Sequence, residues 1–275
     1  MNENELYYGV IDRCIHEGAS DAYCEEIKSQ GYTIIDGGYT QVELDKLRDA
    51  VSELRSTYVD RWGEVFLKEI DEYHSVRLPM SYGHEPIIEL AFNDHVLALV
   101  RNMIRGSFVL NQQNLIINPP GEKYNQSAWH RDLPYQHFVS SRPLAINALF
   151  CLDEFTRDNG ATFVIPASHN AEEFPSESYI KKHAIQLEAP AGSFIVMNCM
   201  TYHRGGFNNS RQERMALNHI YSIPFIKQQI NIPASMDCSV FDEERQKILG
   251  VPYQVPGDVE AFLETRVKAD GYGSG

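Results

Sequence analysis

Three side chains in this sequence have the types and spacing of a metal site. His130 and Asp132 are separated by one residue, and His203 follows much later in the chain. Side chains at positions i and i+2 of an extended strand point to the same face, so His130 and Asp132 can reach one ion together. One carboxylate and two imidazoles suit iron, manganese or cobalt; calcium prefers more oxygen ligands, and closed zinc sites usually contain thiolates. The pattern predicts a facial site for a divalent metal with open coordination positions.

The elements that must position these residues read as short strands separated by turns. Pro119, Pro120 and Gly121 end the first long apolar run, and further turns contain Asn, Gly and Pro. Short strands at this spacing are typical of an antiparallel sandwich or barrel. The expected strands cover Phe108–Asn118, Leu144–Leu152, Ala161–Ile165, Ser193–Asn198 and Met215–Ile223.

An ordered set of motifs resembles the phytanoyl-CoA dioxygenase-like Fe(II)/2-oxoglutarate oxygenases over roughly residues 30–225. The matching pieces are the segment Gly31–Val51, WHRD at 129–132, DNGATFVIPASH at 158–169, and the segment Gly192–Tyr221. The order and spacing of these pieces are more specific than the His-x-Asp triplet alone. The resemblance implies a mainly β fold with flanking helices, built on a double-stranded β-helix (a jelly-roll, cupin-like core).

The resemblance also implies roles for single residues. His130, Asp132 and His203 would ligate Fe(II), and Arg214 would bind the distal carboxylate of 2-oxoglutarate. A guanidinium suits that role because its planar fork donates two parallel hydrogen bonds and stays charged. Relatives that halogenate have a small residue in place of the carboxylate, so Asp132 favours oxygenation. O2 would be the second co-substrate, and succinate and CO2 would be released.

Further residues are candidates for the pocket wall. Gln113, Asn147 and Leu149 are candidate co-substrate contacts, although a solvated strand face is an equally good reading of Gln113. Asn218 lies four residues after Arg214 on the same expected strand, so both side chains can point to the same face and line one cavity. The remaining candidates have either loop or packing roles. Tyr135, Gln136 and His137 fall where relatives have substrate loops, Trp129 is expected to pack, Arg204 to face away from His203, and His169 to stabilise a turn.

Helices are expected to support this core within a single domain spanning 1–275. Thr40 and Glu43 form a capping-box pattern before a helix with an apolar stripe from Leu44 to Tyr58. A second helix is expected over Ile87–Ile104. Residues 1–30 read as a helical extension, 60–82 show no clear period, and 234–275 read as a helix around 242–249 followed by a tail.

The composition limits the possible partners. The chain has 24 Lys plus Arg against 38 Asp plus Glu, a formal net charge of −14, which disfavours nucleic acid as a partner. No apolar run reaches the roughly 20 residues that a membrane helix needs, and the polar, acidic N-terminus is unlike a signal peptide. The five cysteines are scattered and form no CxxC pair. We therefore expect a cytoplasmic protein with reduced thiols.

These observations predict an oxygenase that hydroxylates a small polar metabolite or a sugar-like substrate. Two alternatives stay open: a jelly-roll binding or scaffolding protein with a vestigial metal site, and a cupin-like metal enzyme that does not use 2-oxoglutarate. The sequence does not indicate an oligomeric state.

Overall fold

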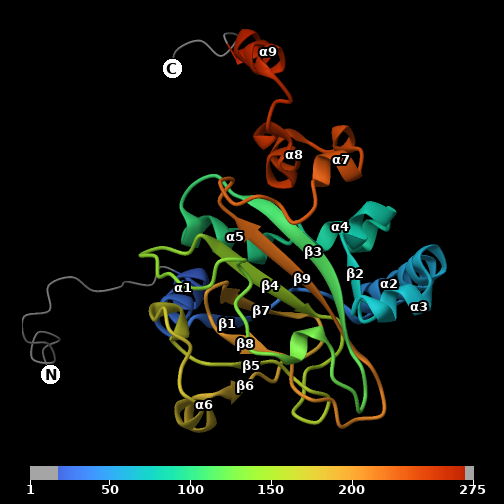
Figure 1. Ribbon diagram of the computed structural model, residues 1–275, viewed down its shortest axis with the longest axis vertical. Coiled ribbons are helices and arrows are strands. Elements are labelled where there is room, and N and C mark those ends of the chain that lie inside the picture. Colours follow the sequence, from blue (N-terminus) through green and yellow to red (C-terminus); the bar gives the residue numbers. More distant parts are fainter. Residues whose placement is uncertain (1–17, 270–275) are drawn as a thin grey trace, which may run out of the picture.

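The computed structural model describes residues 18–269, with side chains up to residue 266. Two antiparallel sheets form its centre (Figure 1). The larger has the strand order β1-β7-β4-β9-β3-β2, and the smaller has the order β6-β5-β8. The strands are β1 (Tyr32–Asp36), β2 (Ser75–Arg77), β3 (Val109–Asn118), β4 (Ala145–Cys151), β5 (Phe163–Val164), β6 (Ile185–Gln186), β7 (Ser193–Asn198), β8 (His203–Arg204) and β9 (Arg214–Ser222).

This arrangement confirms the expected jelly-roll core. Strands distant in sequence alternate in the larger sheet, so that β4 lies between β7 and β9 and is paired on both sides. β3 pairs with β9 along nearly its whole length, with one register shift between Leu110 and Gln112. The expected strands all occur, with ends that differ by one or two residues because turns at their ends break the pairing.

Helices cover one face of the larger sheet, and the functional residues lie on the other. The helices are α1 (Ala19–Gln30), α2 (Gln41–Trp62), α3 (Glu64–Glu69), α4 (Glu85–Leu90), α5 (Asp94–Ile104), α6 (Glu177–His183), α7 (Ile232–Ser235), α8 (Glu243–Leu249) and α9 (Val259–Ala269). Leu54 and Val100 belong to the main core together with sheet residues such as Phe150 and Leu217. A separate cluster between the two sheets includes Phe155. The larger sheet therefore separates a helix-covered core from the interior of the jelly-roll.

The helix predictions were partly right. Thr40 and Glu43 form the expected capping box at the start of α2. The single helix expected over Ile87–Ile104 is wrong, because α4 ends at Leu90 and α5 begins at Asp94. Asn93 stops the continuation: its side chain accepts a hydrogen bond from the Val96 N–H and caps the second helix.

The two ends of the chain also differ in detail from the prediction. Of the expected helical extension over 1–30, residues 1–17 lie outside the described part and the rest contains α1. The aperiodic stretch 60–82 contains the end of α2, then α3 and β2. The expected helix around 242–249 is α8, and α9 follows it as an additional helix beyond the end of the sheet (Figure 1).

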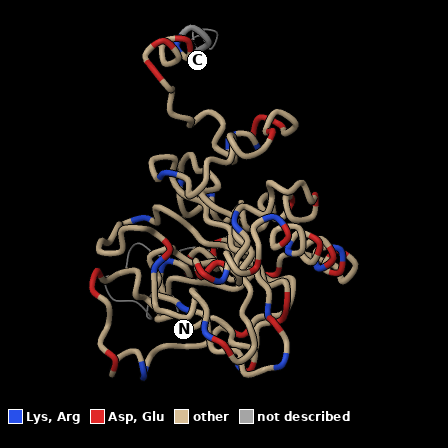
Figure 2. The backbone as a smooth tube through the Cα atoms, turned by 45° about the vertical axis from the view of Figure 1, so that its right-hand side comes forward, with Lys and Arg blue, Asp and Glu red and all other residues tan. Residues whose placement is uncertain are grey.

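Lys and Arg positions are interspersed with Asp and Glu positions along the backbone (Figure 2). Within residues 18–269, no helix combines the length and apolar character needed to span a membrane.

Candidate metal and co-substrate site

Backbone pairing brings the three predicted metal ligands together at the interior face of the jelly-roll. His130 and His203 exchange N–H···O hydrogen bonds of 3.0 Å in both directions, and the Asp132 N–H donates to the Cys199 carbonyl at 3.1 Å. The segment 130–132 therefore lies against the segment that leads into β8. The potential ligand atoms of His130, Asp132 and His203 all lie within 4.8 Å of one another.

Both imidazoles are oriented with Nε2 free for a metal. Nδ1 of His130 lies 2.8 Å from the Ala128 carbonyl oxygen, and Nδ1 of His203 lies 3.0 Å from that of Thr201. A carbonyl oxygen can only accept, so each Nδ1 must carry the proton and donate it. Each Nε2 is then left with a lone pair, which is the form that a metal binds.

The local electrostatics favour a neutral imidazole at His130. Burial lowers the pKa of His130 and so does the neighbouring imidazole of His203, while Asp132 acts in the opposite direction. The two rings lie close, with centroids 4.4 Å apart. Two imidazoles at this distance repel each other when both are protonated. The pair is therefore better suited to share one metal cation than to carry an extra proton on each ring.

The carboxylate of Asp132 is held by neighbouring donors. Its Oδ2 accepts a hydrogen bond of 2.9 Å from the Asn147 side-chain amide on β4, and its Oδ1 lies 3.6 Å from Nε2 of His203. The Cys199 thiol also contacts it: burial and then the Asp132 charge and hydrogen bond raise the pKa of Cys199 well above its ordinary value. The carboxylate of Asp132 is therefore held in place by its neighbours, as a metal ligand should be.

Arg214 supplies a buried positive charge beside the triad. It is the first residue of β9 and is 2% exposed. Its guanidinium packs over the Phe155 ring, and Nη2 makes one long hydrogen bond of 3.5 Å to the Tyr124 hydroxyl. Its Nε and Nη1 have no hydrogen-bond partner among the described residues. Burial lowers the pKa of Arg214, which Tyr124 partly offsets, but a guanidinium stays charged at neutral pH.

The residues present fit an iron ion and an anionic co-substrate. Two neutral imidazoles and one carboxylate form the donor set of a non-haem iron site. Unsatisfied N–H groups on a buried cation suit an anionic ligand, since leaving them unpaired costs free energy and an anion also compensates the charge. A small pocket joins the two features and is lined by Ile116, Tyr124, Gln126, His130, Asn147, Leu149, Thr162, His203, Gly205, Arg214, Ala216 and Asn218.

Most but not all of the predicted pocket residues line this cavity. Asn147, Leu149 and Asn218 do, whereas Gln113 does not. Gln113 lies on the helix-covered face of β3, where its side chain binds the Met80 N–H, the Ile87 carbonyl and Nε2 of His219. The prediction that Gln113 lines the pocket is therefore wrong. Side chains alternate between the two faces of β3, and Ile116 rather than Gln113 points to the inner face.

Trp129 and His169 have the packing and turn roles expected from the sequence. Trp129 packs near Phe174 and under the Arg204 guanidinium, and His169 lies in a short turn with Nε2 3.1 Å from the Lys28 carbonyl. The carbonyl of Gln136 accepts a hydrogen bond from Arg131. Tyr135 and His137 are in contact with each other and do not line the pocket.

Six lining residues were not predicted from the sequence: the polar residues Tyr124, Gln126 and Thr162, and also Ile116, Gly205 and Ala216. Tyr124 and Gln126 lie in the loop between β3 and the triad, where no strand period indicates which side chains point inward. In the structure, the glycine at position 205 leaves room for Tyr124, because a Cβ there would overlap the Tyr124 hydroxyl.

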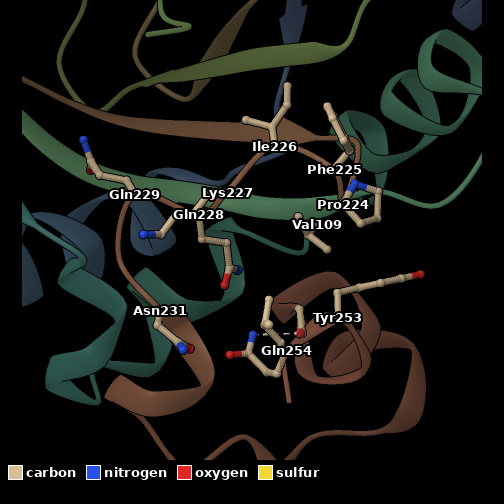
Figure 3. A pocket seen from close by; sticks show the side chains of 12 residues that line it. Val109, Pro224, Phe225, Ile226, Lys227, Gln228, Gln229, Asn231, Tyr253 and Gln254 are labelled. Carbon is tan, nitrogen blue, oxygen red and sulfur yellow. Dashed lines mark hydrogen bonds between the residues drawn. The ribbon is translucent and has the colours of Figure 1, made fainter. Parts of the chain in front are cut away.

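A larger cavity lies elsewhere, at the opposite end of β3 (Figure 3). It has a volume of about 680 Å³ and is lined by Val109, the loop 224–229, Asn231 and residues 250 and 253–255. Its walls contain carboxamides, apolar side chains and Lys227, but no carboxylate or imidazole. This composition gives it no metal-binding chemistry, so size alone does not identify the site.

Comparison with known families agrees with the geometry. The sequence model of the phytanoyl-CoA dioxygenase (PhyH) family matches residues 27–216, which include the triad and Arg214. The chain belongs to the phytanoyl-CoA dioxygenase family. As a member of this family with a His-Asp-His site, it is a non-haem iron dioxygenase that uses 2-oxoglutarate and O2.

Relatives of this family member occur among bacteria and fungi. The protein Rv1501 of Mycobacterium tuberculosis is 29% identical over 252 residues, which cover 89% of this chain and 91% of the relative. Dioxygenase af480 of Aspergillus fumigatus is 27% identical over 156 residues, covering 54% and 48% of the two chains. The chain therefore spans most of the length of its bacterial relative and about half of the fungal one.

Solved structures share the fold. EctD from S. alaskensis, crystallised with 2-oxoglutarate and 5-hydroxyectoine, superposes with a TM-score of 0.63 at 19% identity and covers 80% of each chain. The carbocyclase SnoK from nogalamycin biosynthesis superposes with a TM-score of 0.57 at 17% identity, covering 75% of this chain and 85% of its own. At these identities the likeness extends to the jelly-roll fold alone.

Proposed function

We propose that this dioxygenase hydroxylates a small polar substrate, such as a sugar-like compound or an amino-acid-like metabolite, with release of succinate and CO2. In this proposal His130, Asp132 and His203 hold Fe(II), and Arg214 binds the distal carboxylate of 2-oxoglutarate. The observation that carries it is the buried Arg214 guanidinium, whose Nε and Nη1 lack partners in the pocket that the triad shares.

Each of these residues has a defined task. Bound iron would supply the activation of O2 and the oxidation of a C–H bond. His130 and His203 offer Nε2 because their Nδ1 protons are donated to backbone carbonyls. Arg214 orients the co-substrate with a charge-assisted fork, and the Phe155 ring supports the guanidinium from one side.

The preference for a polar substrate comes from the walls of the pocket. Asn147 and Asn218 line it, and the side-chain oxygen of each is buried without a hydrogen-bond partner. Gln126 and Thr162 add further polar groups. A substrate with hydroxyl or amine donors would satisfy such acceptors, whereas a long acyl chain would leave them unpaired at a cost of about 1–3 kcal/mol each. We therefore favour a substrate with several donors over an acyl thioester.

Arg214 also separates the proposal from its alternatives. In a cupin-like enzyme without 2-oxoglutarate, the buried cation beside the metal would need a different anion as its partner. A binding or scaffolding protein would gain stability if such a cation were replaced by an apolar residue.

The test is an anaerobic titration of the Fe(II)-loaded protein with 2-oxoglutarate, followed by visible absorbance. We expect a weak metal-to-ligand charge-transfer band in wild type and weaker bands in Asp132→Ala and Arg214→Ala. Arg204→Ala is the matched control, because this arginine adjoins His203 but packs against Trp129 and Phe163. Iron binding without a band would refute the co-substrate role, and absence of iron binding would refute the metal site.

Substrate class requires a second measurement. Succinate release would be compared for sets of sugars, amino acids and acyl-coenzyme A thioesters. Turnover coupled to the polar sets supports the proposal, whereas turnover restricted to acyl thioesters contradicts it.

A further inference from the structure

The two carboxylate oxygens of Asp132 have different surroundings. Oδ1 lies 3.6 Å from Nε2 of His203, and the three residues each have a potential ligand atom within 4.8 Å of the others. Oδ2 accepts the 2.9 Å hydrogen bond from Nδ2 of Asn147. Oδ1 therefore faces an imidazole of the triad, and Oδ2 accepts a hydrogen bond from the amide of Asn147.

The orientation of Asn147 is fixed by chemistry and by its place in the sheet. A reversed amide would put the side-chain oxygen against the carboxylate, where two acceptors repel each other. Asn147 is 1% exposed and lies in a central strand, paired with Met197 on β7 and with Ile220 on β9. Its backbone cannot shift without breaking pairs on both sides, so the donor stays where Oδ2 needs it.

We infer that Asn147 is a positioning residue that keeps Asp132 a monodentate metal ligand through Oδ1. The inference rests on the proposed metal site. A carboxylate can bind a metal through one oxygen or through both, and hydrogen bonds from neighbouring residues orient such ligands. Three protein ligand atoms leave about three positions of an octahedral ion open. Chelation by both oxygens of Asp132 would close one of them, at the expense of 2-oxoglutarate or O2.

The role needs a neutral donor, which explains the type of residue. Lysine or arginine at position 147 would bind Oδ2 as a charged partner and would reduce the charge that Asp132 offers to a cation. Leucine would fill the volume but donate nothing. Asparagine supplies one N–H to Oδ2 without adding charge beside the metal.

The test counts open positions on the metal without measuring turnover. Mn(II) is loaded into the whole protein, and the relaxation of water protons reports the number of exchanging waters on the ion. The variants are Asn147→Leu and Asn147→Ala, with circular dichroism as a check of folding; the alanine variant decides if the leucine variant does not fold. Asn114→Leu is the matched control, because Asn114 is also a buried asparagine of this sheet and its amide binds Gln229 rather than Asp132.

The expected result is a loss of about one of roughly three inner-sphere waters, so that the inner-sphere relaxivity of the Asn147 variants falls to about two-thirds of the wild-type value. With saturating 2-oxoglutarate, wild type and Asn114→Leu should retain a water signal that the Asn147 variants lose. Unchanged relaxivity in folded variants overturns the inference. Loss of Mn(II) binding in those variants also overturns it, since a chelating carboxylate should hold the ion at least as well. Failure of wild type itself to bind Mn(II) would refute the metal site rather than this role of Asn147.

Discussion

The guanidinium carbon of Arg214 lies 3.8 Å from the centroid of the Phe155 ring. The ring supports one face of the cation, and the Tyr124 hydroxyl reaches only one of its nitrogens. The interior of the jelly-roll thus holds a positive charge that the described protein residues do not fully satisfy. An incompletely paired buried charge lowers the stability of the ligand-free protein and raises its affinity for an anion.

Replacement of Arg214 by leucine should therefore separate stability from binding. We expect the free energy of unfolding of the ligand-free protein to stay the same or to rise by about 1 kcal/mol, because a poorly paired buried charge is removed. The affinity for 2-oxoglutarate should fall about 100-fold, as expected for the loss of a buried charge pair worth about 3 kcal/mol.

Urea unfolding and the charge-transfer titration measure these two effects. Arg214→Lys serves as the comparison, because an ammonium keeps the charge but lacks the bidentate fork, and its affinity should lie between the other two. A leucine variant that binds 2-oxoglutarate like wild type would contradict the assigned role of Arg214.

Gly205 should control the position of the Tyr124 hydroxyl. A Cβ at Gly205 would overlap that hydroxyl, so Gly205→Ala should displace Tyr124 from Arg214. The guanidinium of Arg214 would then lose the hydrogen bond to Tyr124 that helps to orient it. We expect the affinity for 2-oxoglutarate to fall about tenfold, which is the usual effect of losing one hydrogen bond to a charged group. The affinity for Fe(II) should stay within about twofold of wild type.

Calorimetric titration with the metal and then with 2-oxoglutarate checks this prediction. Gly106→Ala is the matched control, because a Cβ at Gly106 meets nothing within 4 Å. Equal 2-oxoglutarate affinity in both variants would exclude Tyr124 from the co-substrate site.

His219 should make the protein less stable in acid. It is fully buried, and burial lowers its pKa to about 4. Its Nε2 accepts a hydrogen bond from the Gln113 amide, an arrangement that requires the neutral ring. The unfolded chain gains a proton on this histidine below about pH 6.5 and the folded protein does not, so the stabilisation present above that pH is lost as the pH falls towards 4.

We expect His219 to account for about 2 kcal/mol of the stability lost between pH 8 and pH 5. Urea unfolding at the two pH values measures this loss, which should be smaller by that amount in His219→Leu. His183→Gln, a substitution of an exposed histidine, should keep the wild-type difference. An identical pH dependence in His219→Leu and wild type would show that this histidine is charged in the folded state.

The sequence predicted the parts of the site that depend on local spacing. His130 and Asp132 stand at strand spacing, and the position of Arg214 relative to His203 follows a family pattern, so no tertiary information was needed to find them. Gln113 was misplaced because alternation along a strand indicates two faces but not which one meets the helices. The break at Asn93 was missed because the apolar period continues across it, and a single capping side chain ends one helix and starts the next.

The hydrogen bonds exchanged by His130 and His203 have a consequence for how the metal site is built. They join two backbone segments that are distant in the sequence, and the Nδ1 protons of both rings are donated to backbone carbonyls. Backbone pairing within the jelly-roll thus places the two imidazoles side by side, in contrast to small zinc domains, whose folding depends on the metal. A change in the length of either segment would therefore move an imidazole together with its backbone, whereas a substitution of a neighbouring side chain would leave this pairing in place.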